Sequence, residues 1–316
     1  MSTVITGSIA FDYLMTFAGR FKDHILLDQL DRLSLSFLVD GMVRHRGGIA
    51  ANIAYTLSLL GEKPVVMAAV GKDFEEYRAW LEKHGVDTSA IVVIPDVFTA
   101  SFFVNSDMTN AQIAFFYAGA MAESSRLHFR DLEPIPELAV ISPNDPQAMV
   151  QYVAECIDLK IPYLYDPSQQ IIRLDAPQLL EGIRNAVALI ANDYEWGLIK
   201  EKTKLDLAQV NRWTSFTILT LGEKGIDLYN NGEKVRIPAI MPNKLIDPTG
   251  AGDAFRGGFL KGYTRGLDLE ISCRMGALAA TYCIEAQGTQ GHSFDLETFK
   301  ARYQTLFPDQ AGLDAL

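Results

Sequence analysis

The chain has 316 residues, of which 48% are hydrophobic and 21% charged, a composition typical of a globular protein with one large domain and an appendage, or with two domains. Its 28 basic and 39 acidic side chains give a net charge of −11 without a basic run, which argues against nucleic acid or an anionic membrane as the main partner. Three cysteines without a CxxC pair indicate neither a disulfide framework nor a zinc site.

The first residues, MSTVITGSIAFD, lack the basic segment and long apolar core of a signal peptide. No apolar run approaches the roughly 20 residues that a membrane helix needs. We therefore expect a cytoplasmic protein that binds no membrane.

Short apolar runs alternate with helix-period stretches, which predicts an α/β fold with a parallel sheet and helices on both faces. The expected strands are Val4–Ile9, Val65–Val70, Leu138–Ser142, Tyr163–Tyr165, Val187–Ala191 and Thr217–Leu221. The helices expected among them are Ile49–Leu60, Phe74–Lys83, Pro146–Lys160 and Leu205–Arg212. A hairpin of Ile226–Tyr229 and Lys234–Ile237 then leads to helices over Ala251–Thr264, Leu269–Ala286 and Leu296–Leu306.

Two regions, Tyr13–Arg46 and Val92–Gly119, interrupt this rhythm because their apolar and polar residues alternate, as in Ser34–Val39 and Thr99–Val104. Such strands would pair into a small β-sheet lid over the main domain. We expect a core of residues 1–12, 46–91 and 120–316 and a lid of residues 13–45 and 92–119. Exposed aromatic residues on that sheet also suit a dimer surface, and a peripheral hairpin without function is the remaining alternative.

The most informative stretch is Asp247-Pro248-Thr249-Gly250-Ala251-Gly252-Asp253, which precedes an apolar helical segment. A turn of small residues at a helix N-terminus presents free N–H groups to an anion. Asp253 beside such groups would repel a phosphate, but it suits a base that takes a proton from an attacking hydroxyl. The stretch therefore predicts a phosphoryl-transfer centre, with a Gly-rich helix cap as the structural alternative. Arg256, one turn further on, either neutralises phosphate charge or forms a structural ion pair.

Other polar motifs follow predicted strands or open predicted helices. Asp12 comes just after the first strand, where a carboxylate can accept hydrogen bonds from two vicinal hydroxyls. Gly47 and Gly48 open a helix that carries Asn52 one turn later, which permits close approach of a ligand to the backbone.

Asn192 and Glu195 are three residues apart on one helical turn, where they suit hydrated Mg²⁺, a capping box, or both. Thr220 and Gly222 end a strand on which a flat nucleotide can lie. Gln169, Gln170 and Arg173 form a polar run that can recognise the edge of a base or a sugar.

The order of these motifs, from Asp12 to Gly250-Ala251-Gly252-Asp253, resembles the ribokinase or PfkB family of carbohydrate and nucleoside kinases over essentially the whole chain. The resemblance implies a ribokinase-like three-layer α/β/α sandwich with a mostly parallel central sheet and a small β lid. It also implies ATP and Mg²⁺ as cofactors and a homodimer formed through the lid.

A closer resemblance is to bacterial adenosine kinases of the actinobacterial type, in stretches such as HRGGIAAN, AQIAFFYAGAM, NDYEW and QGTQ. It implies that Asp12, Gly48 and Asn52 bind the ribose 2′- and 3′-hydroxyls, that Asp253 deprotonates the 5′-hydroxyl, and that Phe102 and Phe116 stack on adenine. By the same resemblance, Ser8, Ser36, Gln169, Gln170 and Arg173 complete the nucleoside pocket. Asn192, Glu195 (to Mg²⁺ through water), Thr220, Gly222 and the Gly250, Ala251 and Gly252 turn serve ATP. Asp247 and Thr249, with backbone oxygens in the 286–291 region, match a monovalent-cation site for K⁺.

The expected reaction is ATP-dependent phosphorylation of the 5′-hydroxyl of adenosine to AMP, because a purine needs a stacking platform and a bare sugar does not. A kinase for ribose, fructose or another nucleoside is the alternative. A binding or regulatory protein on a kinase scaffold is a third possibility, which the intact Asp253 argues against.

Overall fold

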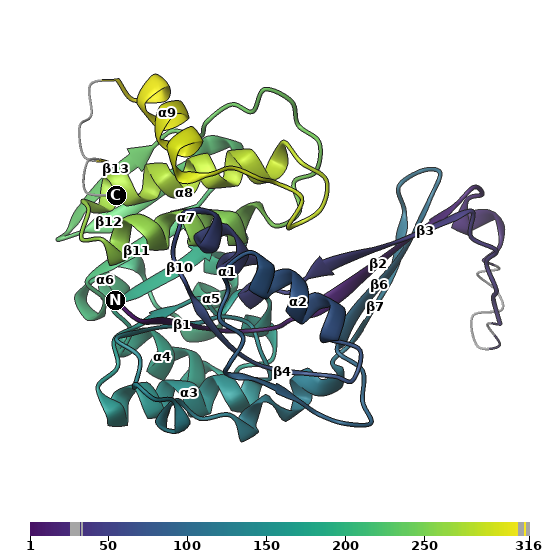
Figure 1. The fold of residues 1–316 in the computed structure, drawn as a ribbon, viewed down its shortest axis with the longest axis horizontal. Helices are drawn as coiled ribbons and strands as arrows, with labels where there is room; N and C mark the ends of the chain where they lie inside the picture. Colours follow the sequence, from purple (N-terminus) through teal and green to yellow (C-terminus); the bar gives the residue numbers. More distant parts are fainter. Residues whose placement is uncertain (26–31, 33, 309–312, 314–316) are drawn as a thin grey trace.

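The computed structural model describes residues 1–25, 32, 34–308 and 313. Within these residues nine strands form the main sheet, in the order β13-β12-β11-β10-β9-β8-β1-β4-β5 (Figure 1). Their bounds are β1 Thr3–Thr6, β4 Val65–Val70, β5 Ile91–Val93, β8 Leu138–Ile141, β9 Tyr163–Tyr165, β10 Ala188–Asn192, β11 Phe216–Thr220, β12 Ile226–Asn230 and β13 Glu233–Ile237. All pairs from β5 to β11 are parallel, whereas β12 and β13 pair antiparallel, so the mostly parallel sheet predicted from the sequence is confirmed.

Helices cover both faces of this sheet. One face packs against α1 Ile49–Leu59, α2 Glu75–Lys83, α7 Ala251–Thr264 and α8 Leu269–Ile284. The other packs against α3 Pro146–Leu159, α4 Ala176–Arg184, α5 Asp193–Thr203 and α6 Leu207–Trp213. Neighbouring strand residues alternate between the two cores, as Ile5 and Val4 do, because side chains of a strand point to opposite faces. Helix α9 Leu296–Leu306 packs outside α8, where it buries Phe299 and Tyr303.

Helices α4 and α5 are not among the helices predicted from the sequence. Both begin with a capping box, Asp175 with Gln178 in α4 and Asn192 with Glu195 in α5. These residue pairs are start signals that sequence analysis can use, but no long apolar period accompanies them. The missed helices complete the layer on the second face of the sheet, so the three-layer architecture stands.

Four further strands form a separate sheet in the order β3-β2-β6-β7, built from β2 Ala10–Phe17, β3 Gly41–Gly47, β6 Ala100–Asp107 and β7 Gln112–Tyr117. This sheet corresponds to the small β-sheet lid expected from the sequence. Figure 1 shows that it extends away from the body of the molecule, and we call it the arm. Only the residues between Thr6 and Ala10 separate β1 in the main sheet from β2 in the arm. The arm is therefore connected to the main sheet at the end of β1, an interior strand between β8 and β4.

The predicted strand Ser34–Val39 is wrong, because the structure places no strand there. Both sides of β2 are already paired, with β3 on one side and β6 on the other, so β2 offers this segment no free edge. Phe37 instead packs its ring on Phe17 and Phe21, with ring centroids 5.1 and 5.0 Å apart. The segment therefore packs through Phe37 without strand pairing, while Leu35 and Leu38 remain exposed.

Two other features of the described residues bear on the sequence analysis. Cys156, Cys273 and Cys283 are free and buried. Among the described helices, none combines the length and the apolar composition that crossing a membrane requires.

Candidate active site

The Gly-rich turn lies at the N-terminus of α7, as the sequence predicts. Gly250 is the N-cap residue with φ 81° and ψ 0°, a left-handed conformation that suits glycine, and no side chain caps this helix end. A Cβ at Gly250 would also lie 2.9 Å from the Cβ of Thr289, so the loop after α8, which carries Thr289, approaches the turn closely. The Ala251 N–H group donates to the carbonyl oxygen of Pro248 at 3.3 Å, whereas the next N–H groups of the turn are available to an anion, and the helix dipole favours negative charge there.

Arg256 forms an internal ion pair beneath the turn. Its guanidinium donates to Asp166 at 2.6 Å and to the carbonyl oxygen of Gly252 at 2.9 Å, and both charged side chains are buried. Of the two interpretations of Arg256, the structure shows the structural ion pair. Burial raises the pKa of Asp166, while the Arg256 charge opposes that rise. The pair connects the end of β9 to the first turn of α7 and thereby fixes the position of the anion turn.

Asp253 lies in the first turn of α7, where its Oδ2 accepts a hydrogen bond of 2.8 Å from Nδ2 of Asn52 in α1. Burial raises the pKa of Asp253 to about 6; the Arg256 charge and the Asn52 hydrogen bond lower it, and the Glu195 charge adds to the rise. A carboxyl group with this pKa is ionised at neutral pH yet basic enough to accept a proton. The predicted base and the predicted Asn52 are therefore in direct contact.

The turn after β1 brings residues that were predicted to bind the nucleoside close to Asp253. Gly48, the N-cap residue of α1, has φ 93°, and a Cβ there would lie 2.6 Å from the carbonyl oxygen of Ser8. The Ser8 hydroxyl accepts from the N–H of Ile49 at 3.2 Å. Burial raises the pKa of Asp12 to about 6, and the Asp253 charge adds to this, so the two carboxylates lie within electrostatic reach.

The register of the arm places four side chains in one row. Asp12 pairs with Phe102, Phe102 pairs with Phe116, and Asp12 pairs with His45 on the other side. Residues paired across neighbouring strands project from the same face of a sheet, so both predicted aromatics share a face with Asp12. Strand spacing puts the backbone of Phe116 about 10 Å from that of Asp12. His45 belongs to this row, although no motif in the sequence pointed to it.

A cavity of about 640 Å³ opens on the other side of the Gly-rich turn. Its walls include the predicted Thr220 and Gly222 together with Ala251 and Gly252 of the turn. Most of the remaining wall is apolar, including Ile240, Phe255, Ala280 and Ile284. The cavity suits a flat aromatic group whose charged end reaches the N-terminus of α7. A second hollow, of about 400 Å³, is lined by Ile171, Leu198 and Lys202 among others, away from this turn.

Asn192 and Glu195 form the capping box of α5, which is the structural alternative from the sequence. The Glu195 amide donates to Asn192 Oδ1 at 2.7 Å, and Glu195 Oε2 accepts from the Asn192 amide at 2.8 Å. The other carboxylate oxygen accepts from the hydroxyl of Ser168 at 2.7 Å. Each oxygen keeps a lone pair for water, so the capping box is compatible with a water-mediated contact to Mg²⁺.

Asp247 binds three donors with its two carboxylate oxygens: the amides of Thr249 and Gly288 at 2.9 Å each, and Gln287 Nε2 at 3.0 Å. The Thr249 and Gly288 hydrogen bonds lower the pKa of Asp247 against the effect of burial. The carboxylate and nearby carbonyl oxygens are hard donors, the type that suits an alkali cation. No cluster of three or more His, Cys, Asp or Glu suited to a metal occurs in the described part of the chain.

The remaining predicted residues differ in how near they lie to this centre. Gln169 and Gln170 follow β9 on the turn that carries Ser168, and Gln170 Oε1 is buried without a hydrogen-bond partner among the described residues. Arg173, at the end of that turn, is exposed. Ser36 is not brought to the others: its neighbour Phe37 packs on Phe17, five residues and about 17 Å along β2 from Asp12.

Sequence analysis missed several polar residues beside the centre. Gln290 donates to Asn52 Oδ1 at 2.9 Å, directly behind the contact between Asn52 and Asp253. Ser142 and Asn144 follow β8 next to Ser8 and bury polar atoms without partners among the described residues. Gln290 is the last residue of the QGTQ stretch, but its role was not predicted, because its contact with Asn52 spans 238 residues.

Comparison with known proteins supports the family resemblance seen in the sequence. The family model described as pfkB family carbohydrate kinase matches residues 9–295. The chain is 31% identical over 294 residues to a nucleoside kinase of Methanothermobacter thermautotrophicus, covering 90% of this chain and 89% of that protein.

Solved structures give the same result for the fold. The Burkholderia thailandensis nucleoside kinase in complex with inosine is 34% identical with a TM-score of 0.88, covering 98% of this chain and 100% of that one. The adenosine kinase of Sinorhizobium meliloti is 20% identical with a TM-score of 0.73, covering 96% and 99%, a similarity that concerns the fold alone. These matches confirm the ribokinase-like fold, while adenosine kinase is the more distant of the two neighbours.

Proposed function

The chain belongs to the pfkB family of carbohydrate kinases, phosphotransferases with an alcohol acceptor, and from this premise we propose that it is an ATP-dependent nucleoside kinase that phosphorylates the 5′-hydroxyl of adenosine. The observation that carries the proposal is the position of Asp253. It lies on the anion turn of α7, hydrogen-bonded to Asn52, between the apolar cavity and the face of the arm that bears Asp12.

The donor nucleotide is assigned to the cavity beside α7. Its apolar walls suit a nucleobase, and Ala251 and Gly252 in its lining belong to the turn whose N–H groups suit phosphate. The Burkholderia enzyme has also been solved with ADP and inosine, at a TM-score of 0.86 and 36% identity. ATP as the donor is consistent with both observations.

The acceptor is assigned to the row on the arm and the carboxyl ends of β1 and β9. Asp12 accepts hydrogen bonds from the ribose 2′- and 3′-hydroxyls, and Phe102 and Phe116 stack on the base. Gln170 has a buried carbonyl oxygen available for a polar group of the base or sugar. A bare sugar would reach Asp12 and leave both aromatic rings unused, and for this reason we favour a nucleoside.

In the transfer step, the 5′-oxygen forms a bond to the γ-phosphorus, and the bond from that phosphorus to the β,γ-bridging oxygen breaks. The 5′-hydroxyl proton passes to the Asp253 carboxylate, and ADP and the nucleoside monophosphate are released. The α7 N–H groups stabilise the transferring phosphoryl group by preorganised dipoles. Closure of the arm over the acceptor would exclude water and prevent wasteful hydrolysis.

Two cations belong to the proposal. Mg²⁺ would neutralise phosphate charge, with Glu195 and Asn192 contacting its water shell. K⁺ would bind Asp247 and Thr249 with carbonyl oxygens of the 286–291 loop. In both places the structure offers hard oxygen donors.

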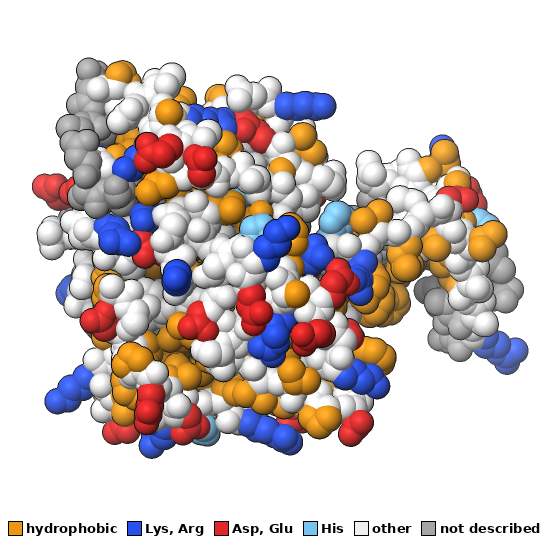
Figure 2. All heavy atoms as spheres, viewed as in Figure 1, with side chains coloured by type: hydrophobic (Ala, Val, Ile, Leu, Met, Phe, Trp, Pro, Cys, Tyr) orange, Lys and Arg blue, Asp and Glu red, His pale blue; other side chains and the backbone are white. Residues whose placement is uncertain are grey.

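We also propose a homodimer that forms through the arm. Phe115, Phe116 and Tyr117 of β7 and Met42 and Val43 of β3 are exposed, and Figure 2 shows hydrophobic side chains gathered where the arm leaves the body. β3 and β7 are the two edge strands of the arm, and exposed apolar side chains on edge strands suit a contact with a second chain. Light scattering tests it: a monomer at micromolar concentration would contradict it.

The test of function is ADP release by purified protein with ATP and Mg²⁺, comparing adenosine with inosine, guanosine, cytidine, ribose and fructose. Turnover with adenosine above the others supports the full proposal. Turnover with another nucleoside keeps the nucleoside kinase and corrects the base. Turnover with a sugar alone contradicts the acceptor assignment and leaves the roles of Asp253 and the anion turn in place.

A further inference from the structure

A continuous hydrogen-bonded chain runs behind the proposed base. Trp80 Nε1 donates to Gln290 Oε1 at 3.1 Å, Gln290 Nε2 donates to Asn52 Oδ1 at 2.9 Å, and Asn52 Nδ2 donates to Asp253 Oδ2 at 2.8 Å. We propose that Gln290 is a positioning residue for phosphoryl transfer, which sets the amide of Asn52 so that its N–H group faces Asp253. This inference rests on the proposed function of Asp253.

The direction of each bond follows from the chemistry of the first donor. An indole nitrogen can only donate, so the atom of Gln290 that faces Trp80 must be the amide oxygen. The Gln290 nitrogen then faces Asn52, so the oxygen of Asn52 must accept and its nitrogen must point the other way. An ionised carboxylate can only accept, so this nitrogen is the one atom of the Asn52 amide that suits Asp253. Trp80 thereby fixes the orientation of the Asn52 amide through Gln290.

The opposite orientation of Asn52 is unfavourable. It would place the amide oxygen against the Asp253 carboxylate, two acceptors in contact with no proton between them. It would also direct the Asn52 nitrogen at the Gln290 nitrogen, leaving a buried donor unpaired. The first penalty comes from Asp253 itself, whereas the second comes from Gln290. Without the Gln290 N–H group, the Asn52 oxygen loses its donor and the Asn52 amide is oriented from one side only.

The network is buried and tied down on several sides. Asn52 is 3% exposed, Gln290 8% and Tyr77 0%, and the Tyr77 hydroxyl receives Gln290 Nε2 while donating to the carbonyl of Gly47 at 2.9 Å. The loop that carries Gln290 is anchored on both sides. The Thr289 hydroxyl donates to the carbonyl of Arg46 at 2.9 Å.

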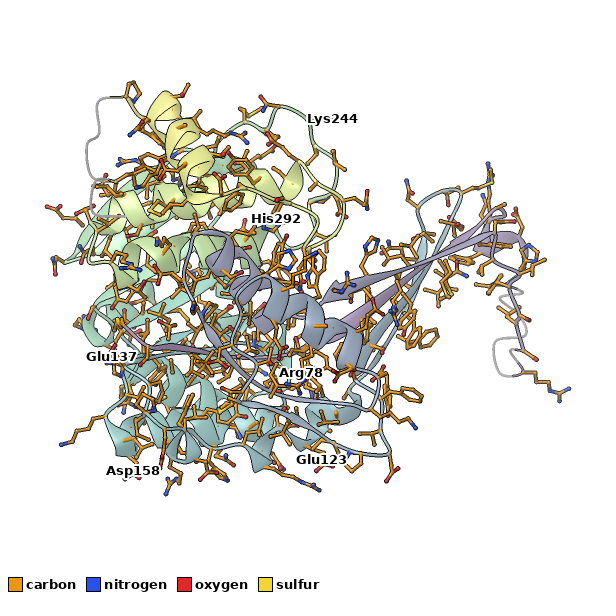
Figure 3. The ribbon with its side chains drawn as sticks, in the orientation of Figure 1. Arg78, Glu123, Glu137, Asp158, Lys244 and His292 are labelled. Carbon is orange, nitrogen blue, oxygen red and sulfur yellow. The ribbon has the colours of Figure 1, made fainter. Side chains whose placement is uncertain are left out.

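On the other side of Gln290, His292 (labelled in Figure 3) accepts at its carbonyl oxygen from the Tyr55 hydroxyl at 2.8 Å. The ring nitrogen Nε2 of His292 lies 3.0 Å from the hydroxyl of Thr56, also in α1. Gln290 is therefore held at a fixed place relative to α1, the helix that carries Asn52.

The charged environment of Asp253 shows what the network adds. The titratable and charged groups that act on Asp253 or feel its charge are Arg256, Glu195, Asp12, Asp166, Tyr77 and Cys283. Among them Arg256 is the cation, and it is also shared with Asp166. The Asn52 N–H group is a second, uncharged stabiliser of the ionised base, and it keeps the pKa of Asp253 from rising further.

The test compares Gln290→Leu and Trp80→Phe with a matched control, Gln151→Leu. Gln151 is a part-buried glutamine of α3, on the opposite face of the main sheet, and its side chain donates to the carbonyl oxygen of Leu127. Trp80→Phe removes the indole donor and keeps an aromatic ring, so it remains informative if Gln290→Leu folds poorly. For each variant, kcat at saturating acceptor and donor is measured from pH 5 to 9, with both KM values and the Tm.

For Gln290→Leu we expect kcat at neutral pH to fall about tenfold and the acid limb to move up by about one pH unit, the size expected for losing a hydrogen bond to a charged group. Trp80→Phe should also lower kcat and raise the pH of the acid limb, but by smaller amounts. The KM for ATP should stay within about twofold. Gln151→Leu should lower only the Tm.

A double variant identifies the path. If Gln290 acts through Asn52, Gln290→Leu has no further effect on kcat in an Asn52→Ala background. Full additivity there, or an unmoved acid limb in Gln290→Leu and Trp80→Phe, overturns the inference. Loss of turnover in Asp253→Asn together with an unmoved limb overturns the inference alone. Turnover retained by Asp253→Asn overturns the proposed function and this inference with it.

Discussion

The two sides of the centre are built differently. The donor side is part of the main α/β body: the turn of α7 is anchored to β9 by a buried ion pair and borders an apolar cavity. The acceptor side lies partly on an arm of four strands that extends from the body, with Phe116 exposed in the row that contains Asp12. One side is preorganised, whereas the other depends on a substrate to cover its aromatic face.

This difference teaches how one scaffold can keep its chemistry and change its acceptor. A preorganised anion turn and base supply transition-state stabilisation whatever alcohol is bound. In the proposed function, recognition of the acceptor comes from side chains on the arm, which extends from the body, and those side chains can change without disturbing the turn.

The largest effect is expected at the base, where both sides meet. Asp253→Asn should lower kcat by about 10²- to 10⁴-fold, because the isosteric amide cannot accept the proton. The Tm and the binding of nucleoside and ATP should remain close to those of the parent, as measured by calorimetry. Near-normal turnover would exclude Asp253 as the base.

On the donor side, Arg256→Met should destabilise the protein by about 3–5 kcal/mol, because it leaves the buried Asp166 without its counter-ion. Denaturant unfolding measures this change. The exposed Arg212→Met in α6 is the matched control and should stay within about 0.5 kcal/mol of the parent. Equal midpoints for the two variants would show that the ion pair does not anchor the turn.

On the acceptor side, Phe102→Ala should raise the KM for the nucleoside about tenfold to a hundredfold through loss of base stacking. The KM for ribose, where turnover is measurable, and the KM for ATP should change little. Phe115→Ala is the control, because Phe115 pairs with Phe103 in the neighbouring row and projects from the other face of the arm. An equal effect of both variants, or equal effects on nucleoside and ribose, would remove the stacking role.

The smallest effect concerns pH. Asp253 acts as a base only when ionised, and its pKa is raised to about 6, so kcat should be constant above pH 7 and fall about tenfold per unit below pH 6. Asp12 also has a pKa raised to about 6, but its protonation weakens acceptor binding and should appear in KM. Asp12→Asn should therefore raise the acceptor KM and leave the kcat limb near pH 6.

Much of the main domain could be predicted from the sequence because its signals are local. Buried parallel strands appear as short apolar runs, and α7 is marked by its glycines and by the apolar residues that follow. Helices α4 and α5 were missed although their capping residues are visible. The buried face of α4, with Leu179 and Ile183, is short, and α5 buries only Glu195 and Ile199, so both give a weak signal. The segment Ser34–Val39 was predicted as a strand because alternation measures burial and does not reveal whether a partner strand is free.

The fold class, the Gly-rich turn of α7 and the proposal of Asp253 as the base could be derived from the sequence, because each depends on residues that lie close together in the chain. Three features became visible in the structure: Arg256 pairs with Asp166, Asp12 shares one row with Phe102 and Phe116, and Ser36 lies at the far end of the arm. The structure likewise brought Gln290 to Asn52 across 238 residues. These outcomes depend on strand register and loop closure, which join distant segments and leave no pattern in either segment alone.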